Sequence, residues 1–139
     1  MASLTITAAN VAAGTNAVIK RGNAGATITA GQVVYLDTTT TGEWLLADAD
    51  AAAAIARGSG QIGIALHGAS DGQPLAVQTE GNITIGATMT AGLAYFLSPT
   101  PGEIGVYGDV GSADYVTLVG VSTSTTVLAL KFFYTGVAL

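Results

Sequence analysis

Short apolar runs, separated by clusters of Gly, Thr, Ser and Asp, recur along the whole 139-residue chain. Apolar runs of about four to eight residues bounded by such clusters are typical of β-strands. The pattern predicts about ten strands, at residues 4–7, 17–20, 33–37, 43–47, 61–66, 75–79, 82–85, 94–97, 115–122 and 127–134. The chain is therefore predicted to be all-β.

The strand predicted at residues 115–122 is apolar on both faces. Because successive side chains of a strand point to opposite faces, Val116 and Leu118 are expected on one face, and Val119 and Val121 on the other. Neither set contains a charged residue. A strand of this kind needs cover on both faces, from a second sheet or from another subunit.

The last predicted strand also has an apolar side chain on its second face. Alternation over residues 128–134 places Leu128, Leu130, Phe132 and Tyr134 on one face, with Ala129, Lys131 and Phe133 on the other. Phe133 is therefore a candidate for a contact between subunits. The alternative is a partly exposed strand end.

One segment departs from the strand pattern. Residues 48–58 read Asp-Ala-Asp, then an Ala-rich run, then Arg57-Gly58. Asp48 or Asp50 can cap the first amides of a helix, Arg57 suits its negative end, and Gly58 can take the left-handed conformation that stops it. The segment predicts one short helix near residues 50–57.

An internal repeat is the most specific feature of the sequence. Gly25–Gly31 recurs as Gly86–Gly92, with six identities in seven positions, and Gly42-Glu43 recurs as Gly102-Glu103. Two copies are too few for a solenoid, which needs at least about three stacked units. We therefore expect a β-barrel-like or β-sandwich single domain over residues 1–139, built on a pseudo-duplicated strand-turn module. Residues 1–20 are expected to form an N-terminal arm or an edge strand.

Charged residues make up only 9% of the chain, against roughly a quarter in an average soluble domain. A chain with so few charges is expected to keep a permanent partner surface. Four basic residues against nine acidic ones exclude the cationic face that nucleic acids require. The longest uncharged stretches are interrupted by Gly, Ser, Thr or Pro, so no membrane-spanning helix is expected.

The residues that could support catalysis are few. His67 is the only imidazole, and Ser70 and Asp71 follow it on a single turn, which cannot direct three side chains at one substrate carbonyl. Asp48 and Asp50 resemble a hard-metal pair, but helix capping explains them better because no further ligands follow at loop spacing. We therefore expect no enzyme activity, no catalytic residue, no metal site and no cofactor.

Two residue pairs are candidates for contact with a ligand or partner. Trp44 and Tyr35 would stack on sugar rings if both were exposed, whereas packing in the core or between subunits is the favoured interpretation. Lys20-Arg21 is the only pair of adjacent basic residues. It would dock onto an acidic partner, or else form a solvated strand end.

Several phrases of the sequence resemble a known family. They are TAGQVVYLD, ADADAAAA, QIGIAL, GQPLAVQTEG, TIGATMTAGLAYFLSPTPGEI and ADYVTLVGVSTSTTVLAL. Together, across residues 24–130, they look like the small β-rich decoration, or cement, proteins of tailed-bacteriophage capsids. The resemblance implies a homotrimeric knob that binds at joints between major capsid proteins and stabilises the shell.

The same resemblance implies a location for the protein and an alternative function. The expected location is the outer surface of the virion capsid, after synthesis in the host cytoplasm. Similar modules occur in phage head fibers and tail fibers, so a carbohydrate-binding or adaptor module of such a fiber is the alternative. The expected partners are a second and third copy of the chain and the major capsid protein, without nucleic acid or membrane. The candidate interface residues are Lys20, Arg21, Trp44, Val119, Val121 and Phe133.

Overall fold

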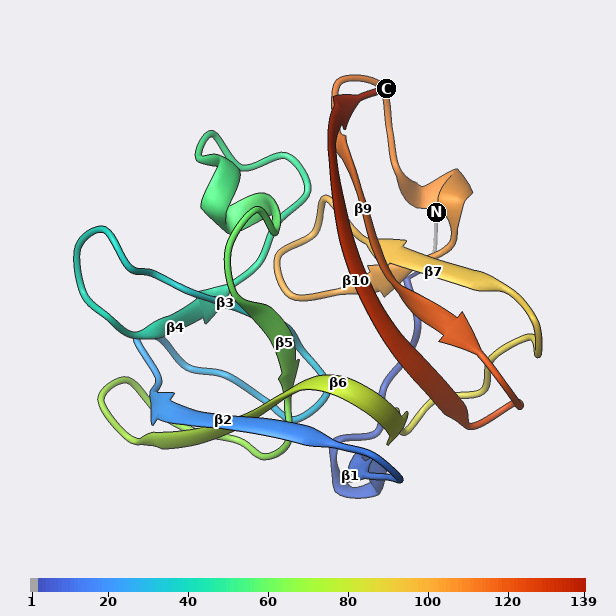
Figure 1. The fold of residues 1–139 in the computed structure, drawn as a ribbon, viewed down its shortest axis with the longest axis horizontal. Coiled ribbons are helices and arrows are strands. Elements are labelled where there is room, and N and C mark those ends of the chain that lie inside the picture. The colour runs from blue at the N-terminus through green and yellow to red at the C-terminus, as the bar shows by residue number, and fades with distance from the viewer. Residues whose placement is uncertain (1–2) are drawn as a thin grey trace.

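In the computed structural model, which describes residues 3–139, a single curled antiparallel sheet of ten strands forms a half-barrel (Figure 1). The prediction of an all-β single domain is confirmed. The strands are β1 (Ala12–Ala13), β2 (Val18–Asn23), β3 (Val33–Leu36), β4 (Trp44–Leu46), β5 (Ile62–Ala65), β6 (Pro74–Thr84), β7 (Ala94–Leu97), β8 (Ile104–Gly105), β9 (Tyr115–Ser122) and β10 (Val127–Ala138). Three short 3-10 helices join them: η1 (Ala8–Asn10), η2 (Ala54–Arg57) and η3 (Tyr107–Asp109).

Most predicted strands are present, with three kinds of difference. Residues 75–79 and 82–85 belong to one continuous strand, β6, and the two-residue strands β1 and β8 are too short to show a period in the sequence. Residues 4–7 form no strand. Their backbone makes single bonds instead, from Leu4 N–H to the Ile104 carbonyl and from Thr7 N–H to the Gly86 carbonyl.

The N-terminal segment lies along the long strand β6. Both β1 and β2 pair with β6 in antiparallel register. Between these two strands, backbone hydrogen bonds join Gly14 and Thr15 to Asn82, so the whole segment follows one edge of β6. The first two residues of the predicted arm lie outside the described part of the chain. Because β1 and β2 occupy one edge of β6, β5 and β10 must share the other edge, one after the other. Figure 1 shows both strands on the same side of β6.

The predicted repeat is confirmed by the sheet order, which is β4-β3-β5-β6-β10-β9-β7-β8. We call β3–β6 the first module and β7–β10 the second module. Each has a hairpin (β3-β4 or β7-β8), then a strand paired to its first strand (β5 or β9), then a long last strand. The two long strands β6 and β10 pair with each other and join the modules.

The repeated heptads form equivalent turns at the entry to β3 and β7. Gly31 and Gly92 both have positive φ, 91° and 81°, which glycine adopts without strain. The Gly31 N–H donates to the Ala65 carbonyl, and the Gly92 N–H donates to the Ser122 carbonyl, each at 2.8 Å. The conservation of this bond between the two copies explains why the heptad is the best-preserved part of the repeat.

The apolar side chains form two cores. The central core draws on both modules and contains Val33, Ile62, Ile64, Ile83, Ile85, Met89, Tyr95, Leu97, Ile104, Val119, Leu128 and Leu130, among others. The smaller core belongs to the first module and contains Trp44, Ile28, Val34, Leu75 and Val77. The modules are therefore held together by shared hydrophobic burial as well as by the β6-β10 pairing.

The predicted short helix near residues 50–57 is only the 3-10 turn η2, and the predicted Asp cap does not form. Asp48 Oδ1 accepts the Asp50 N–H at 3.2 Å, a local turn that competes with helix formation. Gly58 ends the turn in the left-handed conformation as predicted, with φ 110°. The Arg57 guanidinium donates to the carbonyls of Ala51 and Ala52 and lies over the Tyr115 ring, 3.6 Å from its centroid. This segment is held by Arg57 and not by a helix ladder.

We predict that Asp48→Asn stabilises the fold at pH 8. Burial, followed by the neighbouring Asp50, raises the pKa of Asp48 to about 6 from the usual 3.8. A carboxyl with a raised pKa contributes stability that is complete below pH 3.8 and is lost as the pH rises through about 6. Since solvent screens this partly exposed group, we expect Asp48→Asn to raise Tm by only about 2–4 °C at pH 8, and by almost nothing near pH 4. Thermal melts from pH 4 to pH 8 measure this.

Asp37→Asn is the control, because its expected change in Tm at pH 8 has the opposite sign to that of Asp48→Asn. The hydroxyl and amide of Thr39, followed by Thr41, donate hydrogen bonds that lower the pKa of Asp37. The stability that the Asp37 carboxylate contributes is present above the pKa of Asp37 in the unfolded chain. It is lost as the pH falls through the lowered pKa of the folded state, so Asp37→Asn should lower Tm at pH 8. A shift of both variants in the same direction at pH 8 would contradict the assignment.

Candidate interaction surface

Trp44 and Val119, two of the predicted contact residues, lie inside the protein. Trp44 is 1% exposed in the smaller core, and Val119 is 0% exposed in the central core. Their prediction as partner contacts was therefore wrong, and the alternative of core packing for Trp44 is confirmed. Tyr35 packs against the central core, and burial, followed by the Asp37 carboxylate, raises its pKa. Trp44 and Tyr35 therefore form no exposed platform for a sugar ring.

Val119 and Val121 lie on opposite faces of β9, although simple alternation placed them together. Between Tyr95 and Phe96 of β7 the register with β9 shifts, so Val119 is an extra residue in the strand. Such a β-bulge reverses the alternation beyond it. Val121 is consequently 37% exposed while Val119 is fully buried.

Two cross-strand rows form an apolar surface on β7, β9 and β10. Residues directly opposite each other on neighbouring strands point to the same face. Phe96 pairs with Leu118, which pairs with Phe133; Ala94 pairs with Val121, which pairs with Ala129. We call these six residues the apolar face, and none of them is charged.

The side chains of the apolar face range from partly buried to strongly exposed. Phe133 is 63% exposed, as expected for a candidate intersubunit contact. Exposed Tyr107 in η3 meets the Phe96 ring edge-on, with the ring centroids 5.6 Å apart, and extends the face beyond β7. An exposed group of large apolar side chains marks a site of association more often than it marks free surface.

The equivalent surface of the first module is covered within the chain. Sequence offsets and strand pairing match Ala94, Phe96 and Val121 with Val33, Tyr35 and Ile64. Val33 and Ile64 are fully buried, and Tyr35 packs against the same central core. The central core that contains Val33 and Ile64 also contains Tyr95, Leu97, Val119 and Leu128 of the second module. Within residues 3–139, the second module's own apolar face has no such cover.

Lys20 and Arg21 lie on a different strand, β2, and both side chains are exposed. They pair across the sheet with Val77 and Ala76 of β6. Of the predicted interface residues, Val121 and Phe133 share the apolar face, and the basic pair lies on β2 next to β6. Lys20 and Phe133 nevertheless line one groove together, so the two groups meet at that groove.

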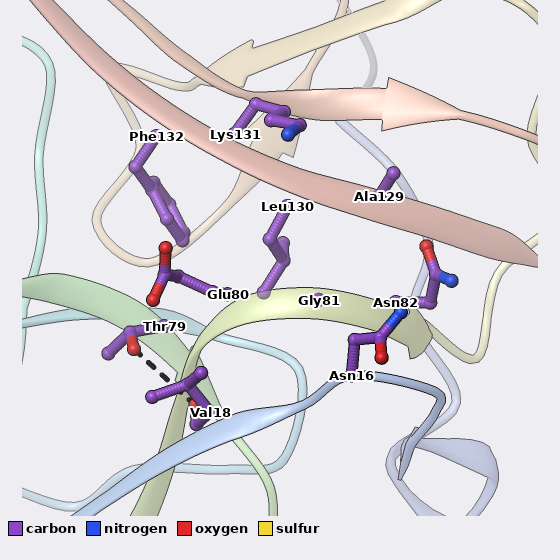
Figure 2. A pocket seen from close by; sticks show the side chains of 10 residues that line it. All are labelled: Asn16, Val18, Thr79, Glu80, Gly81, Asn82, Ala129, Leu130, Lys131 and Phe132. Carbon is purple, nitrogen blue, oxygen red and sulfur yellow. Dashed lines mark hydrogen bonds between the residues drawn. The ribbon is translucent and has the colours of Figure 1, made fainter.

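A groove of about 540 Å³ is lined by β10 on one side and by β6 and β2 on the other (Figure 2). Leu130 and Phe132 point into it from β10, Glu80 reaches toward them from β6, and Lys131 extends away on the other side of the β10 ribbon. A second groove of about 470 Å³ shares Thr79, Glu80 and Phe132 with the first and continues toward residues 58–62. The first groove offers hydrogen-bonding groups and one aromatic ring, Phe132, and the second groove adds the rings of Phe133 and Tyr134.

The remaining candidates for chemistry have structural roles. His67 Nδ1 contacts the Gly68 carbonyl at 2.9 Å, and Nε2 accepts the Ala76 N–H at 3.1 Å, so backbone groups engage both ring nitrogens. Among residues 3–139, no three His, Asp or Glu side chains are arranged to hold a metal ion. In the same residues, no helix has the length and apolar character needed to cross a membrane.

The sequence patterns identified Phe133 and Val121 but missed Phe96, Tyr107 and Leu118. The sequence offered one indication for Phe96, because it occupies the position in the second copy of the repeat that Tyr35 occupies in the first. Only the pairing of β7, β9 and β10 brings Phe96, Leu118 and Phe133 together. Comparisons with models of protein families, with curated proteins and with solved structures found no match to this chain. The proposals below rest on the surfaces described here and on the resemblance in sequence.

Proposed function

We propose that this chain is a structural virion protein that decorates a phage capsid and stabilises it, bound as a trimeric knob at joints between major capsid proteins. The observation that carries the proposal is the apolar face of β7, β9 and β10, whose six residues are all uncharged. A protein that acts by adhesion needs such a surface and needs no convergent catalytic groups.

Burial supplies the binding free energy in this proposal. Apolar area removed from water contributes about 25 cal/mol per Å², so an interface near 1,500 Å² offers roughly tens of kcal/mol before ordering costs are subtracted. A net charge of −5 per chain keeps free knobs apart in solution. Repeated over a lattice, contacts of modest strength add up through multivalency.

The basic pair on β2 is assigned to the capsid side. Lys20 and Arg21 are exposed and adjacent, and they stand out in a chain with four basic residues. A pair of this kind orients an acidic partner surface, while its rim exposure keeps its contribution to affinity small. Moderate salt should therefore weaken docking only slightly.

Addition of the purified protein is predicted to raise the temperature at which undecorated capsids rupture. A ligand that binds the assembled shell and not its unfolded subunits stabilises the shell by mass action, by about 2.7 kcal/mol at one hundred times Kd. Release of packaged or encapsulated dye during heating, with co-sedimentation as the binding assay, measures the effect.

Matched charge variants serve as the controls for this test. Lys20→Ala with Arg21→Ala should weaken co-sedimentation several-fold at low salt, whereas the exchange Lys20→Arg with Arg21→Lys, which keeps both charges, should leave it nearly unchanged. Capsids that rupture at the same temperature with and without saturating protein would rule out the stabilising role.

A carbohydrate-binding or adaptor module of a head fiber or tail fiber is the second candidate. The observation that favours it is the groove of Figure 2, where Phe132 lies with Asn16, Asn82 and Glu80. An aromatic ring beside amide and carboxylate groups suits a sugar. Saturable glycan binding that Phe132→Ala removes, together with no binding to capsids, would favour this candidate over the first.

A further inference from the structure

We propose that the apolar face of the second module is covered by a second copy of this chain. The inference rests on the proposed trimeric knob and names the surface that builds it. The occupant is argued from the repeat, from the charge of the chain and from the symmetry that the face permits.

The repeat shows what becomes of a face of this kind within the chain. The equivalent face of the first module is buried in a core that also contains side chains of the second module. A face of this composition is therefore built to be covered, and because those second-module side chains are buried in every copy, a different surface of the next copy must meet the second face. The second face stays exposed because a single chain contains no third module among residues 3–139.

Charge favours a copy of the same chain at this face and not elsewhere. The chain carries nine acidic and four basic residues, a net charge of −5, so copies repel one another unless they meet at an uncharged surface. None of the nine lies among the six residues of the apolar face. Two copies can approach there without burying an unpaired carboxylate, which would be costly.

Closed rotational symmetry limits how the copies can assemble. An exposed β-sheet face that meets a different surface of the next copy forms a ring when the rotation closes and a filament when it does not. The proposed threefold knob is the closed case. Phe133, which at 63% exposed has the most surface to lose among the residues of the face, is expected to be buried in each contact.

The test compares two valine substitutions with equal starting exposure. Val121 on the apolar face and Val18 on β2 are both 37% exposed, so neither is needed for the core. Light scattering coupled to size exclusion should give about 41 kDa, three times 13.7 kDa, for the unaltered chain and for Val18→Asp. Val121→Asp should give a single-chain mass at the same concentration, with an unchanged circular dichroism spectrum.

A fluorescent probe gives a second, independent measurement. Phe133→Trp places an indole on the apolar face, and Ile19→Trp places one at a 39% exposed position on β2. On dilution below the association range, the emission of Phe133→Trp should shift to longer wavelength as the face becomes wet. Ile19→Trp should show no such shift.

Three outcomes overturn the inference: an unaltered chain that stays a single-chain species throughout the concentration range, loss of association in Val18→Asp but not in Val121→Asp, and loss in both. The capsid assay separates this inference from the proposed function. A single-chain species that still protects capsids would refute the self-association face and the trimeric form but not the stabilising role, whereas a trimer that ignores capsids would refute the stabilising role alone.

Discussion

Replacing Trp44 with Ala is expected to lower the free energy of unfolding by about 3–5 kcal/mol, the usual cost of deleting a large buried aromatic side chain. Trp44 is the largest fully buried side chain and packs in the smaller core with Ile28, Val34 and Leu75. Neighbouring backbone closes tightly around it, since a Cβ added at Gly22 would lie 2.8 Å from the indole nitrogen. Because domains of this size are stable by only about 5–15 kcal/mol, the variant should be near its unfolding limit at 37 °C. Urea unfolding followed by circular dichroism measures the change.

Phe133→Ala is the matched control, because it removes an aromatic side chain that is 63% exposed. We expect it to change the free energy of unfolding of the isolated chain by less than about 1 kcal/mol. A Trp44→Ala variant as stable as Phe133→Ala would contradict the placement of Trp44 and would restore it as a candidate for ligand contact.

Alanine at Gly120 or Gly63 is the second substitution with a large expected effect. The two glycines are equivalent in the repeat: Gly120 pairs with Tyr95, and Gly63 pairs with Val34. A Cβ at Gly120 would overlap the Ala129 carbonyl of β10, and one at Gly63 would lie 2.6 Å from the Gln78 carbonyl oxygen of β6. Since each clash is with the backbone of the next strand, the strands must separate, and we expect a loss of at least about 2–3 kcal/mol in each variant.

Gly68→Ala is the control for this pair. A Cβ at Gly68 would meet only the Ile28 carbonyl oxygen, at an ordinary 3.5 Å. The variant should unfold within about 0.5 kcal/mol of the unaltered chain. If Gly63→Ala and Gly120→Ala were equally mild, the close approach of β5 to β6 and of β9 to β10 would be wrong.

Local periodicity was sufficient for the parts of this fold that depend on neighbouring residues in the chain. The predicted bounds 94–97 and 115–122 coincide with β7 and β9, and the Gly25–Gly31 repeat marks equivalent turns in both modules. Gly58 ends its segment as predicted because a left-handed residue is a local property. In each case the signal and the structure lie within a few residues of each other.

The apolar face could not be derived in this way, because it depends on how distant strands pair. Val119 and Val121 have the spacing of one face, and only the shift of register against β7 separates them. The burial of Trp44 could not be predicted for the same reason. It depends on packing against Ile28 and Leu75, which are both distant from β4 in the sequence. Which face of a strand is covered is a property of the packed modules.

The helix near residues 50–57 shows a competition between local interactions. The Ala run favours a helix, but Asp48 accepts the Asp50 amide and Arg57 binds the carbonyls of Ala51 and Ala52. Those carbonyls would otherwise accept bonds from the next helical turn. Side-chain bonds to the backbone therefore outweigh the intrinsic preference of alanine, and a single 3-10 turn remains.

Electron cryo-microscopy of undecorated capsids mixed with the purified protein tests the central claim most directly, that this chain is an adhesive component of a capsid surface. The unaltered chain is expected to add three-lobed density at joints between major capsid proteins, and Val121→Asp is expected to leave most of those positions empty at the same concentration. Shells without added density in the presence of excess unaltered protein would contradict the claim.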